Sequence, residues 1–133
     1  MEEHRLICNK VKASIIEYAA RMSGGCVLVD LCCGRGGDIF KWNKSNIKKV
    51  LAIDNHPESI KEAINRYKKV SKKIRTRISF MIGDISSIDL TSIIKVKVPI
   101  ISCQFALHYF DLEDILRKVS ENLIFHLFRN PIS

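Results

Sequence analysis

The sequence predicts one α/β domain, a parallel sheet with flanking helices arranged in the Rossmann-like manner. Short apolar stretches typical of strands alternate with longer stretches whose apolar residues recur at helical spacing. A glycine-rich turn, G-R-G-G at residues 34–37, directly follows the first strand-like stretch and precedes a helix-like one. Strand, glycine turn and helix in this order are typical of a sheet that binds a nucleotide. We assign residues 1–133 to this one domain.

The elements around the turn follow from local pattern. Residues 27–30 are the first predicted strand, residues 38–44 a short helix, and residues 50–53 the second strand. A first helix precedes them and ends at the glycines of positions 24 and 25. Its apolar residues recur at helical spacing and are expected to pack ahead of the first strand; they are Ile7, Val11, Ile15, Tyr18 and Met22.

The alternation continues in the rest of the chain. Pro57 suits the first turn of a helix, whose apolar stripe consists of Ile60, Ala63, Ile64 and Tyr67. Residues 78–82 and 98–103 are predicted strands, while residues 86–94 are ambiguous, with room for one or two helical turns. Residues 111–123 continue as a helix, and residues 124–128 are a candidate fifth strand.

The net charge of +8 is concentrated in one part of the sequence. Residues 41–77 hold twelve Lys or Arg against three acidic residues, whereas the remainder of the chain carries a net charge of −1. A cationic surface of this kind suits a polyanion such as RNA. A solvated helix face would have the same composition, so charge alone leaves both interpretations open.

Cysteine spacing and hydropathy exclude other classes of protein. The five cysteines lack the paired spacing of zinc ligands, so we expect no metal and interpret them as small buried residues of a reduced compartment. The N-terminus lacks the apolar core of a signal peptide, and no apolar stretch approaches the roughly 18 residues of a membrane-spanning helix. We expect a soluble intracellular protein without membrane attachment.

One polar residue follows each of four predicted strands; these residues are Asp30, Asp54, Asp84 and Gln104. Because the carboxyl ends of parallel strands meet at one edge of a sheet, where ligands bind, we expect a site there. Each aspartate has the alternative role of capping the next helix, but four polar residues in series beside a glycine turn favour a site. His108 and Tyr109 are candidates for an aromatic wall of the pocket, with an ordinary packed aromatic cluster as the alternative.

The turn itself indicates which cofactor the site takes. In the dinucleotide pattern G-x-G-x-x-G, Cys32 occupies the first glycine position, which makes NAD a weak candidate. Asp30 fits better with enzymes that use S-adenosylmethionine (SAM), in which such a carboxylate lies near the ammonium group of the ligand. Asp54 ends the second strand, where a carboxylate accepts hydrogen bonds from ribose hydroxyls in both cofactor classes.

Two segments carry a specific resemblance to a known family. D-L-C-C-G-R-G-G-D-I-F-K-W, at residues 30–42, resembles the D-L-G-C-G-K-G-G-D-L-x-K-W/Y motif of the mRNA cap guanine-N7 methyltransferases. I-S-C-Q-F-A-L-H-Y-F, at residues 101–110, resembles the S-x-Q-F-x-x-H-Y motif of that family. Residues 9–16 and 52–60 are also similar to family segments, so the resemblance covers roughly residues 5–123.

The resemblance implies a SAM-dependent methyltransferase that modifies N7 of the 5′ cap guanine. No catalytic side chain is expected, because guanine N7 carries an unprotonated lone pair and alignment with the methyl group supplies the acceleration. The implied SAM contacts are Lys12, Asp30, Cys32, Gly34, Asp54, Asp84, Gln104 and Tyr109. The implied cap contacts are Asn9, Arg35, Arg66, His108 and Tyr109, with the two arginines at the cap phosphates. Cys32 stands where the family has glycine.

The resemblance also bears on completeness and partners. The family continues beyond the position of Leu123 with further strands and cap contacts, so we expect this chain to hold the N-terminal, cofactor-binding portion and to lack the C-terminal part. The implied partners are 5′-capped RNA and either a capping-enzyme subunit or a chain that supplies the missing strands. The implied location is the nucleus, or the cytoplasm for a viral protein. The alternative hypothesis is a catalytically inactive remnant that binds RNA or a partner.

Overall fold

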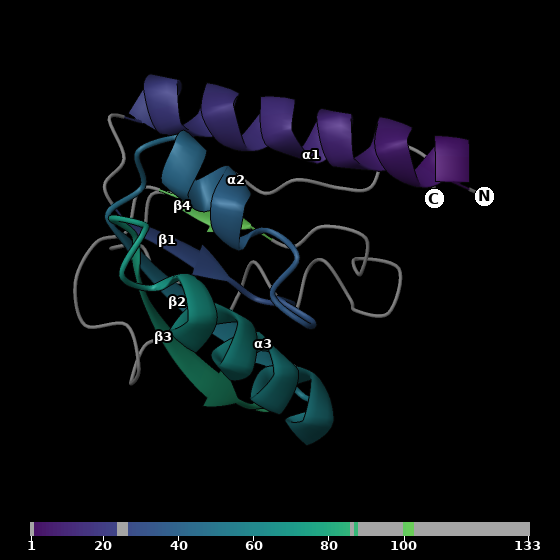
Figure 1. Cartoon of the computed structure of the whole chain (residues 1–133), viewed down its shortest axis with the longest axis vertical. Coiled ribbons are helices and arrows are strands. Elements are labelled where there is room, and N and C mark those ends of the chain that lie inside the picture. The colour runs from purple at the N-terminus through teal and green to yellow at the C-terminus, as the bar shows by residue number, and fades with distance from the viewer. Residues whose placement is uncertain (1, 24–26, 86, 88–99, 103–133) are drawn as a thin grey trace.

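Four parallel strands form one sheet, in the order β3-β2-β1-β4 (Figure 1). The computed structural model describes residues 2–23, 27–85, 87 and 100–102. The strands are β1 (Val27–Asp30), β2 (Lys49–Asp54), β3 (Arg77–Ile82) and β4 (Ile100–Ser102). The helices are α1 (Glu2–Ser23), α2 (Ile39–Lys44) and α3 (Pro57–Val70). The predicted α/β class is confirmed, and each predicted element that falls on described residues is present.

β1 lies in the middle of the sheet, where both faces are covered. Leu28 and Val29 are almost inaccessible to solvent, as expected for a short apolar strand with parallel neighbours on both sides. Val29 is in register with Leu51 of β2 on one side and with Ile101 of β4 on the other. The chain runs outward from β1 through β2 to β3 and then returns to β4, so the strand order reverses between β1 and β4. Ligands of open α/β sheets bind beyond the carboxyl ends of the strands at such a reversal.

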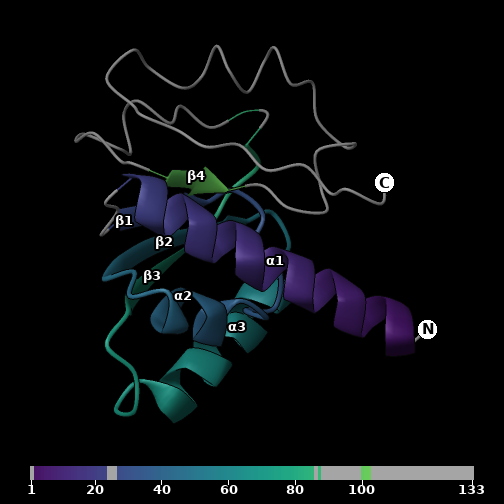
Figure 2. The same ribbon diagram turned by 90° about the horizontal axis from the view of Figure 1, so that it is seen from above.

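Helix α3 packs as its sequence pattern predicts. Ile60 and Ala63 are buried against the sheet, and Figure 2 shows α2 and α3 on one side of the strands. Tyr67, the last residue of the apolar stripe, connects α3 to the start of β3. Its hydroxyl donates to the carbonyl of Thr76 at 3.4 Å and accepts from the amide of Ile78 at 3.4 Å. The helix starts after His56, whose Nδ1 accepts from the amide of Ser59 at 3.2 Å.

Helix α1 packs through a different face from the one its apolar spacing indicates. Tyr18 and Met22 are 59% and 63% exposed, whereas Ile16 and Ala19 are buried. Ile7 is exposed as well, so the prediction of the packing face is wrong. The reason is tertiary: α1 lies beside α2 and β4, and the face turned to them carries Lys12 with Ile16 and Ala19, one and two turns further on. Among the described helices, none is both long enough and apolar enough to cross a membrane.

Candidate cofactor and substrate site

The glycine turn after β1 depends on two positions with left-handed backbone angles. Gly34 has φ +57° and Gly36 has φ +82°, values that a side chain strongly disfavours. At Gly36 a Cβ atom would also lie 3.1 Å from the Cβ of Ala63 and 3.2 Å from its Cα, so the turn touches α3 there. At Gly34 a Cβ atom would meet nothing within 4 Å. The backbone angle of Gly34 therefore favours glycine, and the space beside it is open.

Cys32, which replaces a glycine of the family motif, adds no backbone strain. Among the described residues other than glycine, only Asn46 has a left-handed φ, and Cys32 does not. The amide of Cys32 donates to Oδ1 of Asp30 at 3.0 Å, and its side chain is half-buried. The expectation of small buried cysteines holds for Cys33, while Cys32 is only partly covered. The other cysteine side chains, of Cys8, Cys26 and Cys103, lie outside the described part of the chain.

Asp54 joins the end of β2 to the glycine turn. Its Oδ2 accepts from the amide of Gly34 at 2.8 Å, and its Oδ1 accepts from the amide of His56 at 2.9 Å. The amide of Cys33 donates to the carbonyl of Ile53 at 2.9 Å in the same place. The carboxylate thus ties the glycine turn to the residue that precedes α3, whereas the cap of α3 is the side chain of His56. Each oxygen keeps a second acceptor position, because a carboxylate offers about four in all.

Asp30, at the end of β1, has a carboxyl group whose pKa is strongly raised. Burial first, and then the nearby charge of Asp38, raise the pKa of its carboxyl group to about 7, against the opposing effects of the Cys32 amide and Lys12. Lys12 reaches this corner from α1 and lies 3.5 Å from Oδ1 of Asp38. Lys41 lies 3.3 Å from the same oxygen. A buried carboxyl group with such a pKa is half-ionised near neutrality and gains from a cationic group placed beside it.

The neighbouring Cys33 is not activated as a nucleophile. Burial, followed by the charges of Asp30 and Asp54, raises the pKa of its thiol well above the usual value. The thiolate is the reactive form of cysteine, so the side chain remains a protonated packing group at neutral pH. Within the described ranges, no group of three His, Cys, Asp or Glu side chains is arranged to hold a metal ion.

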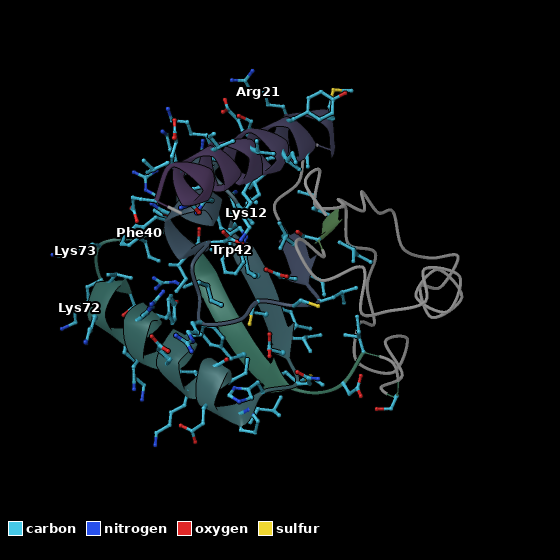
Figure 3. The ribbon with its side chains drawn as sticks, turned by 90° about the vertical axis from the view of Figure 1, so that its right-hand side faces the viewer. Lys12, Arg21, Phe40, Trp42, Lys72 and Lys73 are labelled. Atoms are coloured by element: carbon cyan, nitrogen blue, oxygen red, sulfur yellow. The ribbon has the colours of Figure 1, made fainter. Side chains whose placement is uncertain are left out.

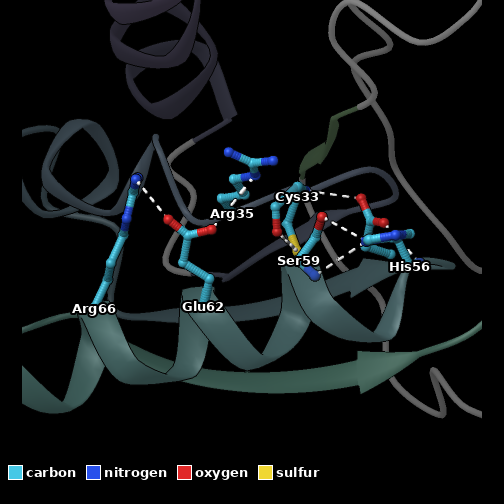
Figure 4. A network of polar contacts seen from close by, with 8 residues as sticks. Cys33, Arg35, His56, Ser59, Glu62 and Arg66 are labelled. Atoms are coloured by element: carbon cyan, nitrogen blue, oxygen red, sulfur yellow. Dashed lines mark hydrogen bonds and ion pairs between the residues drawn. The ribbon is translucent and has the colours of Figure 1, made fainter.

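Arg35 and Arg66 are brought together by a residue that sequence reasoning missed. Glu62 lies between them, with Oε2 3.4 Å from Nε of Arg35 and Oε1 3.2 Å from Nη2 of Arg66 (Figure 4). The spacing of Glu62 and Arg66 on one helix was a signal for their pair, but nothing local indicates Arg35. All three side chains are well exposed. Exposed pairs of this kind contribute little to stability, so the guanidinium groups can exchange Glu62 for a phosphate at small cost.

Of the other predicted site residues, some lie in the described part of the chain and some do not. Asp84 follows β3 and is exposed, and its carbonyl accepts from the amide of Ser87 at 2.9 Å. Asn9 is exposed on α1. The predicted contacts Gln104, His108 and Tyr109 lie outside the described residues. The structure therefore brings Lys12, Asp30, Gly34 and Asp54 to one corner and the arginine pair to the neighbouring face of α3.

Sheet topology, glycine turn and acidic strand ends together define a Rossmann-like domain with a ligand-binding edge at the carboxyl ends of β1 and β2. The fold resembles a solved structure described as a putative S-adenosyl-L-methionine-dependent methyltransferase from Methanococcus maripaludis, with a TM-score of 0.70, 15% identity, and coverage of 96% of this chain and 59% of that one. It also resembles the N-terminal domain of EvdMO1, solved with SAH bound, with a TM-score of 0.70, 16% identity, and coverage of 87% and 47%. At these identities the likeness concerns the fold alone.

The particular family follows from the sequence match. Residues 3–127 match the family described as the mRNA (guanine-N(7))-methyltransferase domain, and this chain belongs to that family. The mRNA cap guanine-N(7) methyltransferase of Caenorhabditis briggsae is 32% identical over 126 residues, which cover 87% of this chain. The matched segment makes up 33% of that relative, so the chain spans about a third of its length.

Proposed function

We propose that this chain is the cofactor-binding portion of an mRNA cap guanine-N7 methyltransferase, and that it binds SAM at the carboxyl edge of β1 and β2. The observation that carries the proposal is the pairing of Asp30 and Asp54 around the Gly34 turn in a chain of this family. SAM supplies a methyl group activated by a positively charged sulfur. The proposed location is the nucleus, with capped RNA and a capping-enzyme subunit or a second chain as partners.

The residues present fit this cofactor in three respects. Asp54 is partly exposed, and its remaining acceptor positions suit the hydroxyls of a ribose. Asp30 has a pKa of about 7 in the protein alone and would be held ionised by an ammonium group. The open space beside Gly34 leaves the backbone accessible to a ligand. Lys12, Cys32 and Asp84 are the described residues that we assign to the rim of the same site. We assign Gln104 and Tyr109, which lie outside the described residues, to SAM as well.

The substrate side of the proposal relies on the arginine pair. The cap carries a triphosphate bridge, and guanidinium groups bind phosphate through paired hydrogen bonds. Arg35 and Arg66 already share an anionic partner in Glu62, so they are oriented toward a common point. We assign Asn9, His108 and Tyr109 to the guanosine. The chain need only hold guanine N7 in line with the methyl group, because no proton has to be removed before attack.

The test of this function is transfer of labelled methyl from SAM to RNA that begins with GpppN, compared with the same RNA beginning with a plain triphosphate. We expect the chain to bind SAM and to label only the capped RNA, with nuclease digestion releasing the label in the N7-methylated cap. Turnover should be slow, because misplacement of the guanine by about 1 Å costs about a hundredfold and the chain spans about a third of its relatives. Equal labelling of both RNAs, or no binding of SAM, would contradict the proposal. RNA binding without SAM binding would favour the inactive remnant.

A further inference from the structure

Three cavities follow one another along the outer face of the helices. The first, of about 310 Å³, lies at the start of α3 and includes Arg35 and Glu62. The second, of about 330 Å³, lies between the glycine turn, α2 and α3 and includes Phe40 and Arg66. The third, of about 550 Å³, lies between α1 and α2 and again includes Phe40. The Glu62–Arg66 ion pair joins the first cavity to the second, and Phe40 joins the second to the third.

Phe40 is the central feature of this row. Its neighbours on α2, Ile39 and Trp42, are buried, whereas Phe40 is 61% exposed. Figure 3 shows Phe40 at the edge of the molecule and Trp42 in the interior. An exposed aromatic ring beside two cavities offers a flat apolar face that an unpaired nucleic-acid base can stack on. The ring is largely outside the core and is available for contact at the surface.

The charges around Phe40 complement a polyanion. Lys10 and Lys44 line the cavity on the α1 side of the ring, and Arg66 and Lys69 line the cavity on its α3 side. Across the three cavities the lining holds seven Lys or Arg against three Glu. Proteins bind single-stranded nucleic acid through such an arrangement. The cations on both sides of the exposed ring contact phosphates, and a base stacks on the ring. A duplex keeps its bases stacked inside and cannot use the ring.

We infer that these cavities form an RNA track, defined by Lys10, Phe40, Lys44, Arg66 and Lys69, which holds the first transcribed nucleotides of a single-stranded transcript. The direction of the RNA along the track rests on the proposed function. The cap phosphates meet Arg35 and Arg66, and the RNA strand then passes over Phe40 toward Lys44 and Lys10. A base stacks on Phe40 while the phosphates before and after it meet Lys69 and Lys44. The track binds the RNA body and is separate from the cofactor corner at Asp30 and Asp54.

The stacking of a base on Phe40 is tested by fluorescence anisotropy with a labelled, GpppN-capped single strand of about ten nucleotides. Phe40→Ala should weaken its binding by about fivefold to a hundredfold, because one base–aromatic stack is lost. Phe40→Trp should retain the affinity, whereas Phe40→Leu, which is apolar but not aromatic, should not. Tyr18→Ala is the matched control, since Tyr18 is equally exposed, at 59%, on α1 outside the three cavities. SAM and the cap dinucleotide GpppG should bind all these variants as they bind the parent chain.

The contacts between phosphates and lysines are tested by the salt dependence of the same binding reaction. Lys44→Gln and Lys69→Gln should each lower the slope of log affinity against log salt by about 0.7, the value for one phosphate of a single strand. Lys72→Gln and Lys73→Gln are the controls, because these lysines are exposed beyond α3 (Figure 3) and should leave the slope unchanged. Unchanged single-strand affinity in Phe40→Ala, or an equal loss in Tyr18→Ala, would overturn the inference. An equal loss of GpppG binding in Phe40→Ala would also overturn it, whereas failure of the parent chain to bind SAM would refute the proposed function instead.

Discussion

Asp30→Asn is expected to stabilise the protein without ligand at alkaline pH while removing most of its affinity for SAM. The pKa of the Asp30 carboxyl is about 7 in the folded chain against a model value of 3.8. Between these values the folded state holds a proton that the unfolded state has lost, so the free energy of unfolding falls as pH rises toward 7 and levels off above it. Asn carries no charge to bury, and its side-chain oxygen can still accept from the Cys32 amide.

The size of the effect follows from the pKa difference. About three pKa units correspond to about 4 kcal/mol of unfavourable free energy in the ionised folded state. Urea unfolding of both proteins at about pH 5 and about pH 8 should show the advantage of the Asn variant growing by about 2 to 3 kcal/mol over that interval. Glu58→Gln, which removes an exposed carboxylate on α3, controls for a general effect of net charge. Parallel stability profiles of the parent chain and Asp30→Asn would contradict the assignment of a buried, proton-holding Asp30.

The SAM affinity of the same variant changes in the opposite direction. Loss of a charge-assisted contact with an ammonium group costs about 1.5 to 3 kcal/mol, or about tenfold to a hundredfold in affinity. In the parent chain the affinity should rise with pH up to about 7, because SAM binds best to the ionised carboxylate. In Asp30→Asn that rise should be absent. Calorimetric titrations across this pH range would show it directly, and the same rise in both proteins would assign the titration to another group.

Asp54→Ala is expected to impair both the turn and the cofactor. Its carboxylate holds the amides of Gly34 and His56 at 2.8 and 2.9 Å, and we assign it to the ribose as well. Removing two charge-assisted hydrogen bonds should cost about 2 to 4 kcal/mol of stability, and SAM affinity should fall by about a hundredfold or more. Asp54→Asn should recover only part of the lost stability and affinity, because its NH2 group replaces one carboxylate oxygen and faces a backbone amide that also donates.

Asp84→Ala provides the comparison for Asp54→Ala. Asp84 is exposed after β3, so its loss should reduce SAM affinity by about tenfold or less and should cost less unfolding free energy than the loss of Asp54. Calorimetry on the folded variants gives the SAM affinity, and urea unfolding gives the free energy of unfolding. An unchanged SAM affinity in Asp54→Ala would refute its role in the cofactor site, whatever the effect on stability.

The strands and the glycine turn were predictable from sequence because their signals are local. β1 is a short apolar stretch that ends in Asp30, and Gly34 and Gly36 adopt the left-handed angles that glycine indicates. The packing face of α1 was not predictable in this way. It depends on partners far along the chain, as the Lys12–Asp38 pair illustrates across 26 positions. Helical spacing identifies a helix but does not choose between two apolar faces when both are present.

The candidate site shows the same division. Asp30 and Asp54 were found because parallel strands place their carboxyl ends together, but the double hydrogen bond of Asp54 and the raised pKa of Asp30 arise from three-dimensional neighbours. Glu62 was missed because its contact with Arg35 joins α3 to the turn after β1. Phe40 lies within the predicted helix of residues 38–44, and only its exposure in the structure marks it as a surface residue.

The central claim is that SAM binds at the corner formed by the ends of β1 and β2. An amide NMR titration of SAM into the isotopically labelled chain tests it most directly, because each backbone amide reports on its own surroundings. We predict the largest shifts at the amides of Cys32, Gly34 and His56, which surround the Asp30 and Asp54 carboxylates. Amides along the cavity between α1 and α2, such as those of Lys10 and Lys44, should change little. Largest shifts at that cavity, or no shifts at saturating SAM, would contradict the account.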